Sequence, residues 1–193
     1  MYDILSVAAG YLLGSVSSTW IVMKIFAKQN VRCGADGTIS PALVFYKLGK
    51  LAFMLATLMD VTLAVTAVLL AKALTHSTPI AMLAGLAAMA GHNWSAYLHF
   101  KGGQGATAMG GAILAIMLVP LCYGVIAAVI TSYFTHKSGL STAVGVLVIS
   151  FVAFIQNGFS TFAIYPLSLF SLMIIKQLQL ARATGHGMVS PDK

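Results

Sequence analysis

The chain has 193 residues, of which 59% are hydrophobic and 8% are charged. A soluble domain carries about 25% charged residues, so this composition excludes a disordered chain, a fibrous repeat and an ordinary cytoplasmic enzyme. It predicts an integral membrane protein of one domain. The formal net charge is +7, which in a soluble protein would indicate nucleic acid binding. Here the basic residues lie mostly between apolar segments, so we interpret the charge as a topology signal and expect no nucleic acid partner.

Apolar segments divide the chain into transmembrane helices joined by short polar loops. Pro120 separates the fourth and fifth segments, which are short and would otherwise merge into one helix too long for a bilayer. Six spans is therefore the alternative count. The seven segments are 3–27, 51–72, 78–98, 105–118, 120–135, 139–156 and 160–177.

The distribution of basic residues favours seven spans over six. With seven spans, only Lys72 of the 11 Lys and Arg residues falls on the outer side, as the preference of basic loops for the cytoplasm requires. Merging the fourth and fifth segments would move Lys137 outside. The sequence thus predicts an all-α integral membrane protein with seven transmembrane helices, two of them short, the N-terminus outside and the C-terminus inside. Residues 1–180 form the transmembrane domain, and residues 181–193 form a short polar cytoplasmic tail.

A glycine-rich segment between the third and fourth spans is the most informative polar feature. Gly102, Gly103 and Gly105 follow Lys101 directly, and three glycines in four positions are unfavourable inside a helix. Backbone N–H groups at the start of a helix, with a lysine beside them, suit a phosphate group. The alternative is a flexible turn between two helices.

Asp60 and His92 are the candidate catalytic residues. Asp60 lies inside the second span, where a carboxylate is costly and must pair with a cation or a hydroxyl group. Its candidate partners are Lys101 and the hydroxyl-rich end of the first span, which includes Ser18. His92 lies near the inner end of the third span. For both residues, a structural tie between helices is the alternative interpretation.

The first inside loop is predicted between Lys28 and Lys50. Its Gly37, Thr38 and Lys47 form a candidate second anion site. Contact of a basic loop with anionic lipid is the simpler alternative.

Several motifs together resemble the bacterial glycerol-3-phosphate acyltransferases that use acyl phosphate, the PlsY family. The sequences GHNW at 91–94 and FKGGQG at 100–105 are similar to the family's second signature, G-H followed by F-K-G-G-K-G. The sequence LLGSV at 12–16 resembles the family's L-L-G-S-I. The sequences LGK at 48–50 and LMDV at 58–61 resemble its L-G-K and L-D segments. The resemblance covers nearly the whole chain.

The resemblance implies a function and a location. Family members transfer an acyl chain from acyl phosphate to the 1-hydroxyl group of glycerol 3-phosphate and release lysophosphatidic acid for phospholipid synthesis. The site is built from inside loops at the cytoplasmic face of the bacterial inner membrane, beside membrane lipid, and needs no metal and no cofactor. By this resemblance Lys101 and the amides of Gly102, Gly103 and Gly105 hold phosphate, while His92 and Asp60 support the loop.

The chain departs from the family pattern at several polar positions. Residues 35–46 keep only Gly37 of the first signature in register, and Lys47 stands one residue beyond its arginine. A carboxylate at Asp36 would repel a bound phosphate. The replaced positions are Asp36 for serine, Leu43 for asparagine, Tyr46 for arginine, Leu63 and Gln104 for lysines and Gly139 for serine, and 176–180 has neither His nor Glu.

These departures leave two further functional hypotheses beside acyl transfer. The first is a catalytically impaired family member that binds a lipid phosphate or a membrane partner. The second, suggested by Asp60 within a span, is a small transporter, and it ranks lowest because the chain shows nothing resembling inverted repeats.

Overall fold

The part of the chain that the computed structural model describes, residues 2–27 and 41–185, is all-helical. This confirms the predicted helical class. Five helical segments are long and apolar enough to cross a membrane, while α4 and α5 are shorter. The helices are α1 (Tyr2–Ser15), α2 (Ser18–Ala27), α3 (Pro41–Thr75), α4 (Thr78–Asn93), α5 (Ala106–Ile116), α6 (Leu118–Thr135), α7 (Ser138–Asn157) and α8 (Thr161–Gly185), with a 3₁₀ turn η1 (Ala96–Leu98).

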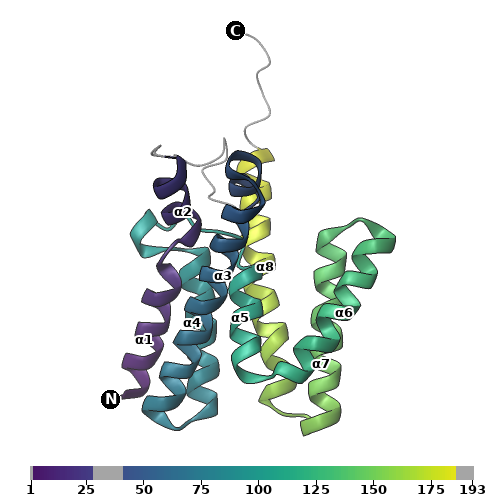
Figure 1. Cartoon of the computed structure of the whole chain (residues 1–193). Helices are drawn as coiled ribbons and strands as arrows, with labels where there is room; N and C mark the ends of the chain where they lie inside the picture. Colours follow the sequence, from purple (N-terminus) through teal and green to yellow (C-terminus); the bar gives the residue numbers. More distant parts are fainter. Residues whose placement is uncertain (1, 28–40, 186–193) are drawn as a thin grey trace.

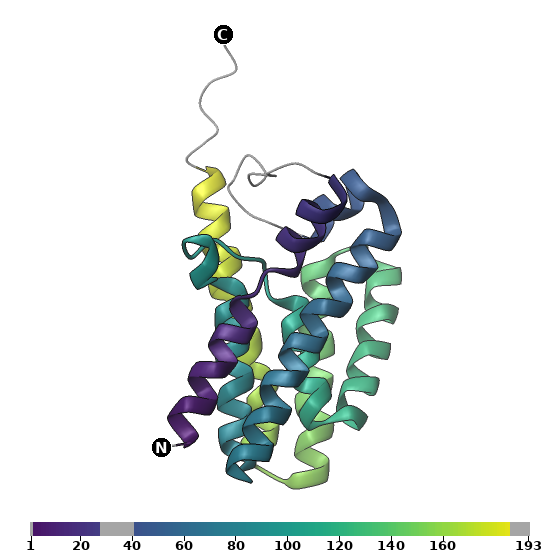
Figure 2. The ribbon, with the colours of Figure 1, turned by 60° about the vertical axis from the view of Figure 1, so that its left-hand side comes forward.

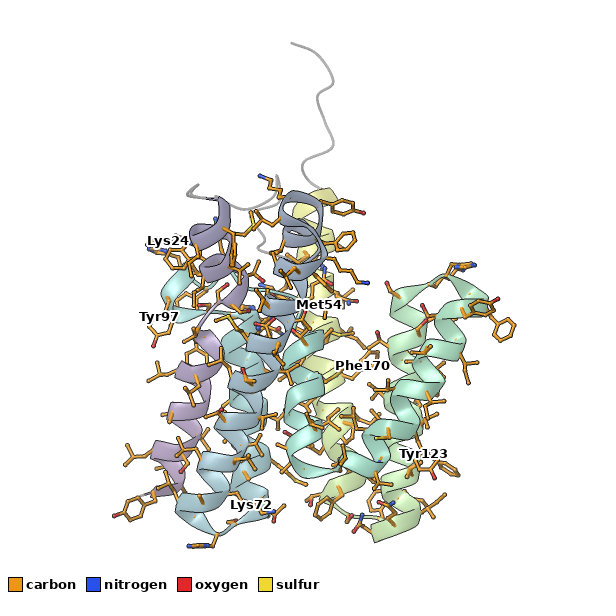
Figure 3. All side chains as sticks on the ribbon, viewed as in Figure 1. Lys24, Met54, Lys72, Tyr97, Tyr123 and Phe170 are labelled. Carbon is orange, nitrogen blue, oxygen red and sulfur yellow. The ribbon has the colours of Figure 1, made fainter. Side chains whose placement is uncertain are left out.

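The helices run roughly parallel to one axis and form a bundle (Figure 1). α2 continues from α1 toward the end of the bundle at which α8 ends, and α3, α4, α5 and α6 then alternate in direction. α6 and α7 form a hairpin that stands beside the other helices (Figure 2). Lys24 and Lys72 lie toward opposite ends of the bundle (Figure 3). The end that holds Lys24, the glycine-rich segment and the end of α8 is called the basic end below.

Several helix boundaries differ from those expected. The chain breaks after Ser15, so the first predicted span consists of α1 and α2. The fourth and fifth segments separate at Met117, and Pro120 is the third residue of α6. Proline is tolerated there because the first N–H groups of a helix have no partner within it. α8 continues through residues 181–185, which the sequence assigned to the tail.

Small residues allow α1 and α4 to pack closely. A Cβ atom at Gly14 would overlap the backbone of Ala88, and one at Gly10 would overlap that of Ala84. A Cβ at Gly91 would likewise overlap the Tyr11 carbonyl oxygen. Close backbone approach of this kind is a principal source of attraction between helices in lipid. This seam fixes the end of α4, and therefore the segment that follows it, against α1.

A second contact region lies where α2 meets the start of α3. Val44 is fully buried with Val22 and Met23 of α2. The expected inside loop is therefore helical from Pro41 onward, which corrects the prediction that it continues to Lys50. Gly49 interrupts α3 with φ +83°, a conformation that glycine adopts without steric cost. The break lets the first turns of α3 pack against α2.

Candidate functional site

Asp60 is the centre of a buried polar cluster near the basic end. It is 2% exposed and lies on α3. Its Oδ1 accepts a hydrogen bond from the Ser18 hydroxyl of α2, and its Oδ2 accepts one from the Thr107 hydroxyl of α5 at 2.9 Å. Ser18 belongs to the hydroxyl-rich segment that the sequence offered as a partner, and that expectation is confirmed. Lys101 is exposed and is not among the side chains that pair with Asp60.

His92 connects this cluster to the glycine-rich segment. Its Nδ1 lies 3.5 Å from Asp60 Oδ1, and its side chain is 9% exposed. Its Nε2 faces Gly103 so closely that a Cβ atom at that glycine would overlap it. Asp60 therefore contacts one side of the imidazole ring, and the ring lies directly against the glycine-rich segment. Thr107, which completes the cluster, was not predicted, because nothing local in the sequence distinguishes it from other threonines.

The glycine-rich segment packs directly on the last turn of α4. Gly102, Gly103 and Gly105 are buried, while Lys101 and Gln104 are exposed. A Cβ at Gly102 would overlap the His92 carbonyl oxygen, and one at Gly105 would overlap the Asn93 side chain. Gly105 also has φ +84° and directly precedes α5. The glycines are therefore needed for close backbone contact, which argues against a flexible turn.

The amide groups of this segment are not equivalent. Gly103 N–H donates to the His92 carbonyl oxygen at 3.1 Å, so this amide is already used within the protein. The N–H groups at the start of α5 have no partner within the helix. The first intrahelical bond of α5 is the one that Met109 N–H donates to the Gly105 carbonyl oxygen. An anion held by backbone groups would therefore bind at the start of α5, with the Gly105 amide but without the Gly103 amide that the sequence also offered.

Residues 94–100 are held in place by a hydrogen-bonded junction with α1. Tyr11 Oη donates to the Trp94 carbonyl oxygen at 2.8 Å, and Ser95 Oγ donates to the Ser15 carbonyl oxygen at 2.5 Å. His99 and Phe100 both have positive φ, 52° and 61°, which is an uncommon conformation for residues with a side chain. The junction thus compensates for strained backbone immediately before Lys101.

The remaining predicted site residues lie apart from the Asp60 cluster or outside the described residues. Lys47 is exposed on the first turns of α3. Gly37 and Thr38 fall in the segment 28–40, outside the described residues. Within residues 2–27 and 41–185 the structure has no group of three His, Cys, Asp or Glu side chains placed to hold a metal ion.

The fold and the site define a multi-pass helical membrane protein with a buried carboxylate–histidine cluster beneath a docked glycine loop. The family model described as "Glycerol-3-phosphate acyltransferase" matches residues 4–183. The chain therefore belongs to the glycerol-3-phosphate acyltransferase family, as the sequence motifs indicated.

Curated relatives and solved structures agree with this assignment. A protein of Shouchella clausii named glycerol-3-phosphate acyltransferase is 33% identical over 175 residues, which cover 89% of this chain and 83% of the relative. One of the same name from Clostridioides difficile is 36% identical over 152 residues, 75% of this chain and 73% of the relative. The fold matches crystal structures of PlsY (YgiH), described as an integral membrane glycerol 3-phosphate acyltransferase. The lysophosphatidic acid form gives a TM-score of 0.81 at 19% identity, covering 97% of this chain and 93% of that chain.

Proposed function

We propose that this protein is a membrane acyltransferase that transfers an acyl chain from acyl phosphate to glycerol 3-phosphate and forms lysophosphatidic acid. The observation that carries the proposal is the family match over residues 4–183, nearly the full length of the chain. A glycerol 3-phosphate form of the structurally similar PlsY supports the choice of acceptor. The protein works beside membrane lipid and without a metal or cofactor in this proposal.

The chemistry requires little from the protein beyond positioning. The 1-hydroxyl oxygen of glycerol 3-phosphate forms a bond to the acyl carbon, and the bond from that carbon to the phosphate oxygen breaks. The hydroxyl proton leaves with the released phosphate. Because the donor is already activated, catalysis consists of holding two anions in register and stabilising the departing charge.

The described residues suit these two tasks. The N–H groups at the start of α5 and the Lys101 side chain would hold a phosphate group. Gly102, Gly103 and Gly105 would shape that site through close packing on α4. His92 and Asp60 would fix its position, and Lys47, with Gly37 and Thr38 of the first inside segment, would bind the second anion.

An apolar groove gives the acyl chain a place to lie. It begins at Ala106, immediately after the glycine loop, and passes between α5 and the α6–α7 hairpin. Gly110 contributes open space on the α5 side, since a Cβ there would meet no atom within 4 Å. The groove joins the proposed phosphate site to the lipid-facing surface, which matches a donor that has a charged head and an apolar tail.

The distribution of charge supports the orientation in the membrane. By the helix bounds, Lys72 in the last turn of α3 is the only described Lys or Arg residue at the end opposite the basic end, and such residues favour the cytoplasm. We place the basic end and the C-terminus at the cytoplasmic face of a bacterial inner membrane, the N-terminus outside, and seven spans between them. Residues 1–180 would then be the transmembrane domain, and the polar residues that follow would be its cytoplasmic tail.

Phosphate release by the purified protein tests the function. Acyl phosphate is supplied with and without glycerol 3-phosphate, and lysophosphatidic acid is measured in the same samples. Release that depends on glycerol 3-phosphate and equals product formation is the expected result. Binding of glycerol 3-phosphate without turnover would instead assign the chain to the catalytically impaired class.

A further inference from the structure

Lys176 is a buried lysine that the site described above does not use. It lies on α8 and is only 5% exposed. Its ammonium group lies 5.7 Å from the centre of the Trp94 ring, a cation–π distance. Trp94 Nε1 in turn donates to Gln179 Oε1 at 3.0 Å, which fixes the ring on α8.

The charge of Lys176 has no carboxylate partner within residues 2–27 and 41–185. The chain has four acidic residues, and this part contains two of them, Asp3 and Asp60. Both Asp60 oxygens accept hydrogen bonds from other helices, and Asp3 lies in the first turn of α1, at the opposite end of the bundle. The cation–π contact with the Trp94 ring offsets only part of what the ammonium group loses on leaving water.

The surroundings of Lys176 connect it to the glycine loop. One turn earlier on α8, the Leu172 carbonyl oxygen accepts a hydrogen bond from Asn93 Nδ2 at 3.3 Å. Asn93 is the residue on which Gly102 and Gly105 pack. The segment after α4 and the second half of α8 lie side by side (Figure 2). A cation at Lys176 is therefore held on the α8 side of the loop to which the phosphate site was assigned.

We propose that Lys176 binds a substrate phosphate group and supplies positive charge that this chain lacks at Gln104 and Leu63. The inference rests on the proposed function, since it takes its ligand from the two anionic substrates. Lys176 acts as a point charge on a long stem, and the Trp94 ring restricts where that stem can point. A bound phosphate would supply the anionic partner that the Lys176 ammonium group lacks among the described residues.

The test measures steady-state kinetics of Lys176→Met, which keeps the apolar stem and removes the charge. Each substrate is varied while the other is saturating, so that the acyl phosphate and glycerol 3-phosphate contributions are separated. We expect the Michaelis constant for one substrate to rise by at least about tenfold, the usual effect of losing a charge-assisted hydrogen bond. Lys176→Arg, which keeps the charge and the stacking on Trp94, restores most of that loss.

The matched control is Lys137→Met, at an exposed lysine of the α6–α7 turn, which leaves both Michaelis constants unchanged. Unchanged constants in Lys176→Met overturn the proposal and leave Lys176 as a packing residue. Should the methionine variant not fold, Lys176→Gln is measured in its place with the same expectation.

The experiment also separates this inference from the proposed function. If the unmodified protein shows no turnover but binds glycerol 3-phosphate in a calorimeter, the proposed acyl transfer is overturned. The inference then requires Lys176→Met to weaken that binding by a similar factor, and unchanged binding overturns it too. If the unmodified protein binds neither substrate, both are overturned.

Discussion

Thr107 donates a hydrogen bond to Asp60 at 2.9 Å and so joins the first turn of α5 to the middle of α3. The same threonine lies two residues after Gly105, at the end of the docked glycine loop. One hydroxyl group therefore connects the polar cluster in the bundle to the N–H groups proposed to face a phosphate.

Replacing this threonine should destabilise the protein measurably. Thr107→Val leaves one Asp60 oxygen without its donor, and we expect a loss of about 1–3 kcal/mol. Thr62→Val is the matched control, since the Thr62 hydroxyl is exposed and donates only to the Met59 carbonyl oxygen of its own helix. Thermal unfolding in detergent measures the stability of both variants. Equal losses of stability would show that the hydrogen bond to Asp60 does not stabilise the protein.

Alanine at position 103 should lower activity without unfolding the protein. The added Cβ overlaps His92 Nε2, so the ring must shift away from Asp60 and disturb the loop it supports. We expect turnover to fall by about ten- to hundredfold, as small misplacements in active sites do. Gly103→Val should additionally abolish binding of phosphate ligands.

Position 139 provides the control for that variant. A Cβ at Gly139 would meet no atom within 4 Å, so Gly139→Ala should keep full activity. If Gly103→Ala also folds and binds glycerol 3-phosphate as the unmodified protein does, the segment is only a turn.

The seam between α1 and α4 should not tolerate even one added methyl group. A Cβ at Gly14 overlaps the Ala88 carbonyl oxygen, and backbone cannot move aside as a side chain can. We expect Gly14→Ala to cost about 1–3 kcal/mol. Gly110→Ala, on the open face of α5, should instead gain up to about 1 kcal/mol through helix propensity. Chemical denaturation measures the free energy of unfolding of both variants and distinguishes the expected loss from the expected gain.

Restoring family cations should improve the proposed reaction. Gln104 and Tyr46 are both exposed, so Gln104→Lys with Tyr46→Arg adds charge without disturbing packing. We expect the Michaelis constants to fall by about two- to tenfold.

Adding Asp36→Ser should give the largest gain, because a free carboxylate near a bound phosphate opposes binding by roughly 1–4 kcal/mol. Asp36, which lies outside the described residues, stands where the first signature of the family has serine. Activity that the triple substitution leaves unchanged would show that the alignment of this segment is wrong.

Cysteine labelling tests the orientation in the membrane. In a background without Cys33 and Cys122, a cysteine at position 137 should react from the cytoplasmic side, and one at position 72 from the outside. Labelling of position 137 from the outside would contradict seven spans.

The sequence predicted the helical class and the approximate extent of the apolar segments, because bilayer thickness constrains their length. Among the described residues, five helical segments are long and apolar enough to cross a membrane. The predicted end of the fifth segment agrees with the end of α6 at Thr135, but α6 starts at Leu118 and not at Pro120. The start was misplaced because proline is compatible with the first turn of a helix as well as with a break between helices. The helical residues after Pro41 were missed, although proline at the first helical position and Gly49 beyond it mark such a segment.

The site was predictable only in part, because some of its contacts depend on packing between segments far apart in the sequence. Ser18 as a partner of Asp60 followed from the cost of burying polar groups in lipid. The pairing of Gly103 with the His92 carbonyl oxygen depends on how residues 94–102 fold back onto α4, which no local pattern specifies. The contact between Lys176 and Trp94 joins segments more than eighty residues apart, so it required the packed bundle.

The placement of Asp60 has a consequence for how the protein is made. α3 enters the bilayer after Ser18 has been synthesised but before His92 and Thr107 exist, so two of the three partners of the carboxylate arrive later. During that interval the nascent helix has a polar group in hydrocarbon at a cost of about 2.5–3.5 kcal/mol on the insertion scale. The apolar residues around it must outweigh that cost until α4 and α5 are inserted. The insertion of α4 and α5 then supplies the remaining two partners of the carboxylate and removes that cost.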